Sequence, residues 1–151
     1  MKILFICLGN ICRSPMAEFV MKDLVRRAGE EAQFVIASAA TSREKIGNDT
    51  HYGTRRILDE KHIPYTRRAA VQLTRADYEK YDLLIGMDTA NLRGIERITG
   101  GDPQHKVHLL LEFAGENRSI ADPWYTDNFE ETYRDVLCGC EALYRWIKKH
   151  K

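Results

Sequence analysis

The chain has 151 residues, a length that suits one domain with a single substantial core. Its 23 basic and 22 acidic side chains give a formal net charge of +1, which argues against a surface built to bind nucleic acid or an anionic membrane. Cysteine occurs at positions 7, 12, 138 and 140, without the spacing of a zinc site, so we expect neither a metal nor a cofactor.

The beginning of the chain carries only a short apolar stretch. Five apolar residues follow Met1 and Lys2, too few for the apolar region of a secretory signal peptide, and no other stretch approaches the length of a membrane span. We therefore expect a cytoplasmic protein with reduced thiols and no membrane partner. Secretion without a signal peptide stays open.

The first predicted element is a buried strand over residues 3–6 that leads directly into a tight loop, residues 7–14. Ser14 as N-cap and Pro15 at the first helical position predict that a helix begins there. Gly9 and Asn10 both tolerate positive φ, as a tight turn requires. The loop thus lies between a strand's carboxyl end and a helix's amino end, where backbone N–H groups can converge on an anion.

Two side chains give this loop its chemistry. A guanidinium at Arg13 can hold two phosphoryl oxygens. The same positive field favours the thiolate form of Cys7, to which the Ser14 hydroxyl can donate. A thiolate that faces a bound phosphate predicts in-line attack, whereas the other interpretation is a buried strand-end thiol and a surface arginine. The predicted phosphate-binding residues are Leu8, Gly9, Asn10, Ile11, Cys12 and Arg13.

Cys12 lies five residues after Cys7 on the same loop, whose curvature can bring the two sulfurs within bonding distance. If Cys7 is oxidised to a sulfenic acid, Cys12 can trap it as a disulfide before further oxidation. The spacing makes this redox role possible and leaves open whether the two cysteines pair.

A helix and a second strand follow the loop. Apolar residues at 17, 20, 21, 24 and 28 form one helical face, and Gly29 ends the helix. Residues 34–37 are a predicted strand, and in a parallel sheet Ser38 falls beside the first loop. Residues 43–50 are a predicted polar loop, and 53–61 a predicted helix. His51 and His62 are expected in solvent, and the arginines at 55, 56, 67 and 68 are interleaved with acidic residues rather than gathered into a basic patch.

The same alternation continues to the end of the chain. A short helical turn is predicted at 77–80, strands at 83–87 and 107–111, a helix capped near Asp88, and an irregular loop at 113–120. The last predicted helix is capped near Asp127 and has a core stripe that includes Cys140, with Cys138 off the stripe. Four strands alternating with helices predict a single α/β domain, residues 1–151, with a four-stranded parallel sheet flanked by helices and the phosphate loop after the first strand.

The segment Asp122-Pro123-Trp124-Tyr125 combines a carboxyl group, a rigid turn residue and two large rings. On composition alone it is a turn whose aromatic rings are tucked into the core. A carboxylic acid in such a loop can also protonate a leaving phenolate.

The sequence resembles the low-molecular-weight protein tyrosine phosphatases over nearly its whole length. The resemblance implies hydrolysis of phosphotyrosine, in proteins or small aryl phosphates, through a cysteinyl-phosphate intermediate. It assigns Cys7 as nucleophile, Arg13 as phosphate clamp and Asp122 as general acid and then base, and it implies that Ser38 braces Asn10. The segments that carry it are residues 7–15, 38–42, 46–48, 87–88, 91–92 and 122–125.

Two positions depart from that family's pattern. Glu44 stands where members commonly carry an aromatic residue that stacks on the substrate ring, so the predicted cleft consists of Glu44, Trp124 and Tyr125. Either Glu44 weakens ring binding and repels acidic peptides, or it points into solvent and Arg43 or Lys45 neutralises it. A His that commonly joins the loop-bracing hydrogen bonds is also missing near Arg67 and Arg68.

Three alternative functions are disfavoured. Arsenate reductases that share such a loop use additional cysteines in the middle of the chain, and none occurs between 13 and 137. A phosphotyrosine-binding module without turnover would be expected to lack the nucleophile or the acid, and both are present. In the larger tyrosine phosphatases the acid precedes the cysteine, whereas Asp122 follows Cys7. The sequence identifies neither the physiological substrate nor the oligomeric state.

Overall fold

The centre of the protein is a parallel four-stranded sheet, seen in a computed structural model that describes residues 1–150. The strand order is β2-β1-β3-β4. In register, Lys2 pairs with Val35 and Cys7 with Ala40, so β1 and β2 end together. The strands are β1 (Lys2–Cys7), β2 (Val35–Ala40), β3 (Leu83–Gly86) and β4 (Val107–Leu109).

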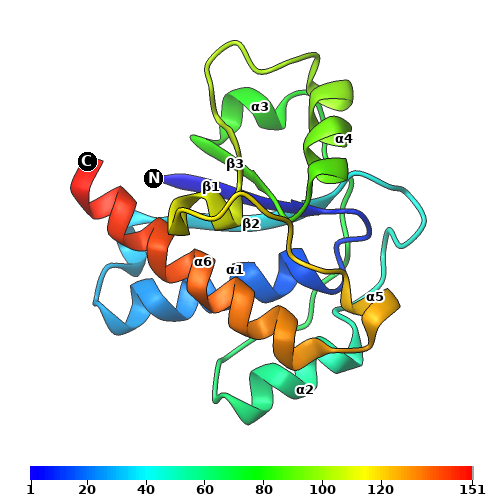
Figure 1. The fold of residues 1–151 in the computed structure, drawn as a ribbon, viewed down its shortest axis with the longest axis vertical. Coiled ribbons are helices and arrows are strands. Elements are labelled where there is room, and N and C mark those ends of the chain that lie inside the picture. Colours follow the sequence, from blue (N-terminus) through cyan, green and yellow to red (C-terminus); the bar gives the residue numbers. More distant parts are fainter. Residues whose placement is uncertain (151) are drawn as a thin grey trace.

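Helices cover both faces of the sheet. Figure 1 shows α3 and α4 on one side of it and α1, α2 and α6 on the other. The loop after β1 lies at the same end of the molecule as α5. The α-helices are α1 (Arg13–Arg27), α2 (Tyr52–Glu60), α3 (Asp77–Lys80), α4 (Thr89–Thr99), α5 (Pro123–Thr126) and α6 (Phe129–His150), and the 3₁₀ helices are η1 (Glu31–Gln33) and η2 (Leu110–Ala114).

The hydrophobic core is divided into two clusters by the sheet. Side chains alternate along a strand, so Phe5 and Cys7 of β1 belong to the cluster shared with α1 and α6. Leu4 and Ile6 point the other way, into the cluster shared with α4. This alternation places the Cys7 side chain on the face of the sheet that α1 covers.

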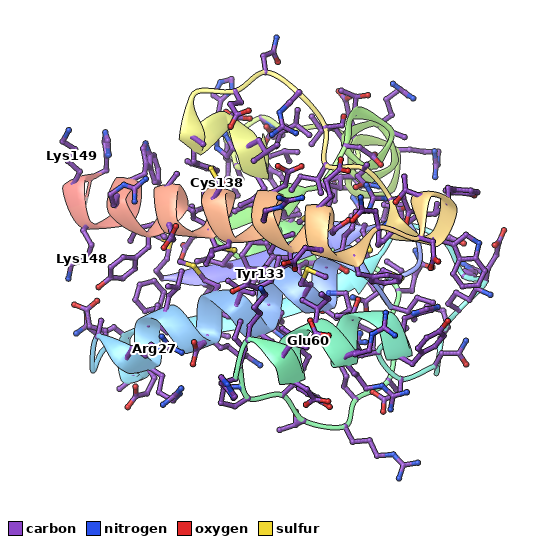
Figure 2. All side chains as sticks on the ribbon, turned by 60° about the horizontal axis from the view of Figure 1, so that its bottom comes forward. Arg27, Glu60, Tyr133, Cys138, Lys148 and Lys149 are labelled. Atoms are coloured by element: carbon purple, nitrogen blue, oxygen red, sulfur yellow. The ribbon has the colours of Figure 1, made fainter. Side chains whose placement is uncertain are left out.

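The long helix α6 packs on α1 and η2 through the predicted apolar stripe. Figure 2 shows Tyr133 on the side of α6 that faces α1 and α2. Cys140 is fully buried, as its place on the stripe predicts, whereas Cys138 is exposed. Within residues 1–150, no helix is both long enough and apolar enough to cross a membrane.

Several predicted boundaries are wrong by a few residues. The second strand extends to Ala40, because Ala40 still pairs with Cys7. The fourth strand ends at Leu109, where the chain turns into η2. The cap predicted near Asp127 is the next residue, Asn128, whose Oδ1 accepts from the N–H of Glu131 at 3.0 Å.

Candidate active site

The loop after β1 is held from outside through its carbonyl groups. Thr41 and Ser42 donate backbone N–H groups to the carbonyls of Cys7 and Leu8, at 3.0 and 2.9 Å. The N–H of His51 donates to the Ile11 carbonyl at 2.8 Å. Because these carbonyls point away from the loop's centre, the adjacent amides are left facing inward.

Four of those amides have no acceptor within the described part of the chain: the N–H groups of Leu8, Gly9, Ile11 and Cys12. The Asn10 N–H donates to Cys7 Sγ at 3.3 Å. Unpartnered amides that converge beside a helix amino end form a site for an anion of phosphate size. All six predicted phosphate-binding residues thus lie in this loop or at the first position of α1.

The tight turn depends on Asn10 and Gly9 for different reasons. Asn10 has φ +58°, the left-handed region that asparagine tolerates, and its side chain is fully buried. Of the two residues expected to tolerate positive φ, only Asn10 adopts it, and Gly9 does not. A Cβ at Gly9 would lie 3.3 Å from Lys45 Cγ, so glycine here permits the loop to approach its neighbour.

Ser14 contacts the thiol and does not cap the helix. Helix α1 begins at Arg13, and the N-cap position belongs to Cys12, whose side chain makes no capping bond. Ser14 Oγ lies 3.0 Å from Cys7 Sγ and accepts from Asn10 Nδ2 at 2.8 Å. Since Asn10 supplies that donor, the Ser14 hydroxyl proton is available to Cys7, as predicted.

The Arg13 guanidinium is buried and held by three oxygen atoms. Nη1 donates to Asp88 Oδ2 at 2.7 Å and to the Ile120 carbonyl at 2.8 Å, and Nη2 lies 3.4 Å from Asp122 Oδ2. Burial alone would lower the pKa of Arg13, but the neighbouring Cys7, Asp122 and Asp88 outweigh it and raise that pKa. Arg13 is therefore a fixed cation at the bottom of the loop.

Asp88 and Ile120 are site residues that the sequence reasoning missed. Asp88 is the predicted helix cap, since its Oδ1 accepts from the Asn91 N–H at 2.7 Å. Its other oxygen holds Arg13. The signals that could have found it were its place directly after a predicted strand and its place in a segment that carries the family resemblance. The Ile120 N–H donates to the Met87 carbonyl at 2.8 Å, which attaches the segment before Asp122 to the end of β3.

Asp122 is brought to the loop by that attachment and by its own turn. Its Oδ1 accepts from the Trp124 N–H at 3.0 Å, which starts α5, and its Oδ2 faces Arg13. Trp124 and Tyr125 are exposed rather than tucked into the core, so the alternative of a purely structural turn is wrong for these rings.

A cleft of about 110 Å³ opens over the loop. Glu44, which the sequence analysis predicted as a cleft residue, is exposed at the rim of this cleft. Lys45, which was not predicted, extends across it and places Nζ 4.6 Å from the centre of the Trp124 ring. The cleft is lined by Cys7, Leu8, Gly9, Ile11, Cys12, Arg13, Ser42, Glu44, Lys45, Asp122, Trp124 and Tyr125.

Ser38 does not brace Asn10, so that implied contact is wrong. Ser38 pairs with Phe5, two residues before the loop begins, and its hydroxyl donates to Glu18 Oε1 at 2.6 Å. Asn10 Oδ1 instead accepts from the Arg68 guanidinium and from the Val71 N–H, the latter at 3.1 Å. A brace therefore exists, but it comes from the segment before Gln72.

His51 lies between elements and not in solvent, contrary to prediction. Its Nδ1 accepts from the Gly53 N–H at 3.0 Å and caps α2. Its ring stacks on Phe129 and meets the Trp124 ring edge-on, with centroid distances of 5.2 and 5.7 Å. Burial, followed by the Arg55 charge, lowers the pKa of His51, which favours the neutral form that this cap requires. The residue links the loop, through Ile11, to the segment that carries Asp122.

The second loop cysteine has the character of a neutral thiol. Burial, and next the charge of Cys7, raise the pKa of Cys12 to about 12. Cys7 and Cys12 are both free and buried. Within residues 1–150 no group of three or more His, Cys, Asp or Glu side chains is placed to hold a metal ion.

Comparison with known proteins gives one family for the sequence. The family model of the low molecular weight phosphotyrosine protein phosphatases matches residues 2–151. The low molecular weight protein-tyrosine-phosphatase YfkJ of Bacillus subtilis is 36% identical over 151 residues, which cover 99% of this chain and 97% of that protein. Its crystal structure covers 100% of this chain, and this chain covers 96% of it, with a TM-score of 0.96.

Two further crystal structures are similar. That of a low molecular weight protein tyrosine phosphatase from Streptococcus pyogenes is 40% identical, with a TM-score of 0.85 and coverage of 98% of this chain and 91% of that one. The structure of an arginine phosphatase from Drosophila is 25% identical, with a TM-score of 0.88 and coverage of 98% of each chain.

Proposed function

The chain belongs to the low molecular weight phosphotyrosine protein phosphatase family, and we propose that it hydrolyses phosphotyrosine in proteins, or small aryl phosphates, through a cysteinyl-phosphate intermediate. Residues 1–151 act as one phosphatase domain in this proposal. The observation that carries it is the convergence of the Cys7 thiol, the Arg13 guanidinium, the Asp122 carboxyl and the unpartnered loop amides on one cleft.

The loop binds the phosphoryl group before any bond changes. The unpartnered amides of Leu8, Gly9, Ile11 and Cys12 and the Arg13 guanidinium surround its non-bridging oxygens, which fixes phosphorus in front of Cys7 Sγ. Because these donors are already in place without substrate, they stabilise the charge of the trigonal-bipyramidal transition state without reorganising.

Attack by Cys7 begins the first chemical step. The thiolate forms the S–P bond as the bond from phosphorus to the phenolic oxygen breaks, and Asp122 gives its proton to that leaving oxygen. In the second step the Asp122 carboxylate takes a proton from water, which attacks phosphorus and releases inorganic phosphate and the Cys7 thiolate. Ser14 supports both steps, because its hydroxyl donates to the sulfur whenever the sulfur carries negative charge.

The walls of the cleft favour an aryl substrate. Trp124 and Tyr125 are exposed at its rim and can flank a phenyl ring, while the thiol lies at its base. The free cysteines and the need for a reduced Cys7 support action in a reducing compartment, the cytoplasm. Fractionation of cells with an antibody against the chain tests that location, and recovery outside the cytoplasm contradicts it.

A substrate panel tests the function. Phosphate release is measured from matched peptides that carry phosphotyrosine, phosphoserine or phosphoarginine, and arsenate reduction is measured with a thiol reductant. The phosphoarginine peptide is included because one structural relative is named an arginine phosphatase. We expect release from phosphotyrosine alone, and Cys7→Ser should abolish it while vanadate still binds. Turnover by Cys7→Ser contradicts the proposal. So does a preference for the phosphoserine peptide, the phosphoarginine peptide or arsenate.

A further inference from the structure

Arg68 is a partly buried cation behind the loop, directly beside an exposed arginine. Its guanidinium donates to Asn10 Oδ1 and, at 3.4 Å, to Thr50 Oγ1. Its own N–H donates to Asp49 Oδ1 at 3.2 Å, which fixes the backbone there. Arg67 is exposed and makes none of these contacts. Within residues 1–150, Arg68 forms no ion pair with a carboxylate, so its hydrogen bonds go to neutral groups.

The contact with Arg68 decides how Asn10 is oriented. A guanidinium can only donate, so the Asn10 atom that faces it must be the carbonyl oxygen. The Val71 N–H donates to the same oxygen at 3.1 Å and imposes the same choice. The Asn10 NH₂ group is therefore turned toward Ser14, to whose Oγ it donates at 2.8 Å.

The orientation of Asn10 in turn decides what Ser14 offers to the sulfur. Ser14 Oγ accepts from Asn10 Nδ2, which leaves its one proton free to be donated to a Cys7 thiolate, whose Sγ lies 3.0 Å away and can only accept. The Asn10 N–H gives the sulfur a second donor at 3.3 Å. Arg68, Asn10 and Ser14 thus form one directed series of hydrogen bonds that ends on the sulfur.

We propose that Arg68 is a positioning residue that orients Asn10 and Ser14 as donors to the Cys7 thiolate and supplies a fixed positive charge behind it. This rests on the proposed role of Cys7 as nucleophile. The charges around Arg68 agree with it: burial lowers the pKa of Arg68, while Glu18, Asp49 and Cys7 oppose that effect. Of these three, Glu18 already binds Lys22 and Ser38, and Asp49 accepts from two backbone amides.

The test measures Cys7 directly rather than through turnover. Iodoacetamide alkylation of Cys7 is followed by mass spectrometry between pH 4 and 8, at roughly half-unit steps suited to the width of a one-proton titration. The variants are Arg68→Gln, which keeps a donor for Asn10 and loses the charge, and Arg68→Lys, which keeps both. Arg67→Gln is the matched control, because it removes the same charge one residue away from an exposed position.

In Arg68→Gln we expect the midpoint of the alkylation profile to rise by about one pH unit, the size of effect expected for one nearby charge. Below that midpoint kcat for an aryl phosphate should fall about tenfold, since one unit corresponds to a tenfold smaller thiolate fraction. KM should change little, because Arg13 and the loop amides remain. Arg68→Lys should retain most of the wild-type profile, and Arg67→Gln should match wild type in every measurement.

An unchanged midpoint in Arg68→Gln overturns the proposal, and a lower melting temperature with that unchanged midpoint shows that Arg68 only supports the fold. An equal shift in Arg67→Gln also overturns it, because the effect would then be one of net charge. A failure of the proposed function is distinguishable, since it appears as turnover in Cys7→Ser and leaves the alkylation profile readable.

Discussion

At the scale of single residues, the predicted phosphate clamp Arg13 is held by partners far away in the sequence. Arg13 is held by Asp88, 75 positions later, and by the Ile120 carbonyl, 107 positions later. Asp122 faces the same guanidinium at 3.4 Å and is also tied to the Trp124 amide. Its carboxyl therefore has a fixed direction, which a proton donor to a leaving group requires.

Asp122→Ala should slow the release of basic leaving groups far more than that of acidic ones. A phenolate that leaves unaided needs no proton, whereas a general acid typically contributes about 100- to 10,000-fold for one that does. The measurement is kcat across a series of substituted phenyl phosphates, with Asp127→Ala as a control, since Asp127 does not line the cleft. A uniform small loss across the series would mean that another group is the acid.

Oxidation tests the predicted role of Cys12. Peroxide should inactivate the wild type in a way that dithiothreitol reverses, whereas Cys12→Ser should recover much less, because its Cys7 sulfenic acid proceeds to irreversible forms. Burial and the charge of Cys7 raise the pKa of Cys12 to about 12, so trapping should become faster as the pH rises toward that value. Cys138→Ser is the control, and equal recovery in both variants removes Cys12 from this role.

A substitution at the rim of the cleft tests the effect of Glu44, which stands where family members commonly carry an aromatic residue. In the part of the chain that the structure describes, neither Arg43 nor Lys45 forms an ion pair with Glu44, and Lys45 lies over the Trp124 ring instead. Glu44→Tyr should improve kcat/KM for aryl phosphates by about 2- to 10-fold, the worth of one aromatic contact. The penalty for acidic flanking residues should also shrink. Identical kinetics on neutral and acidic peptides, before and after the change, would place Glu44 outside the substrate's reach.

At the scale of elements, a glycine allows α6 to pack closely against η2, as Gly9 allows the loop after β1 to pack against Lys45. A Cβ on Gly139 of α6 would lie 2.5 Å from Leu110 Cγ of η2, a branch point of a fully buried side chain. The absence of a side chain at Gly139 therefore lets α6 approach η2. The same helix begins beside the segment of Asp122, since Thr132 Oγ1 donates to the Ala121 carbonyl at 3.2 Å.

Gly139→Ala should lower the free energy of unfolding by about 1 to 2 kcal/mol. Overpacking costs about 1 to 3 kcal/mol, and the better helix propensity of alanine returns up to about 1 kcal/mol. Denaturant titration measures the change, with Cys138→Ala as control, because that side chain is exposed on the neighbouring position. Equal or greater stability in Gly139→Ala would show that Leu110 moves aside at little cost.

At the scale of the whole molecule, the site joins the two halves of the chain. The nucleophile loop follows β1, the rim follows β2, Asp88 follows β3, and Asp122 lies shortly before α6. Figure 1 shows that these segments meet at one end of the sheet. Global unfolding must therefore destroy the anion site, so binding of an anion is coupled to the stability of the fold.

Phosphate should raise the melting temperature, because it binds only the folded chain. At a concentration 100-fold above Kd the stabilisation is about 2.7 kcal/mol, which corresponds to a rise of about 5 to 11 °C for a chain of this size. Differential scanning calorimetry measures it, and Cys7→Ser should retain the shift because its amides and Arg13 remain. Arg13→Met should lose most of it, and an equal shift in Arg13→Met would place phosphate elsewhere.

The sequence by itself determined the order of elements and the nature of the reacting groups. Hydrophobic period and turn residues are local properties, so the alternation of strands and helices, the loop of residues 7–14 and the stripe of α6 could all be predicted. The placement of Cys7 and Arg13 in a loop that can bind an anion could be predicted from residue type and from position after a strand, whereas the role of Asp122 was implied only by the family resemblance. The boundaries were less certain, because the length of β2 depends on its pairing with β1.

Only the tertiary structure decided which groups support the reacting ones. Asn10 could have bonded Ser38 or another donor, and the choice of Arg68 over Arg67 depends on which of two adjacent arginines the chain turns inward. His51 is polar and was expected in solvent, yet it packs between Phe129 and Trp124. Arg68 lies 58 positions from Asn10 in the sequence, and Phe129 lies 78 positions from His51. Their contacts form because distant segments of the chain meet in the folded structure, and local sequence patterns do not predict which segments meet.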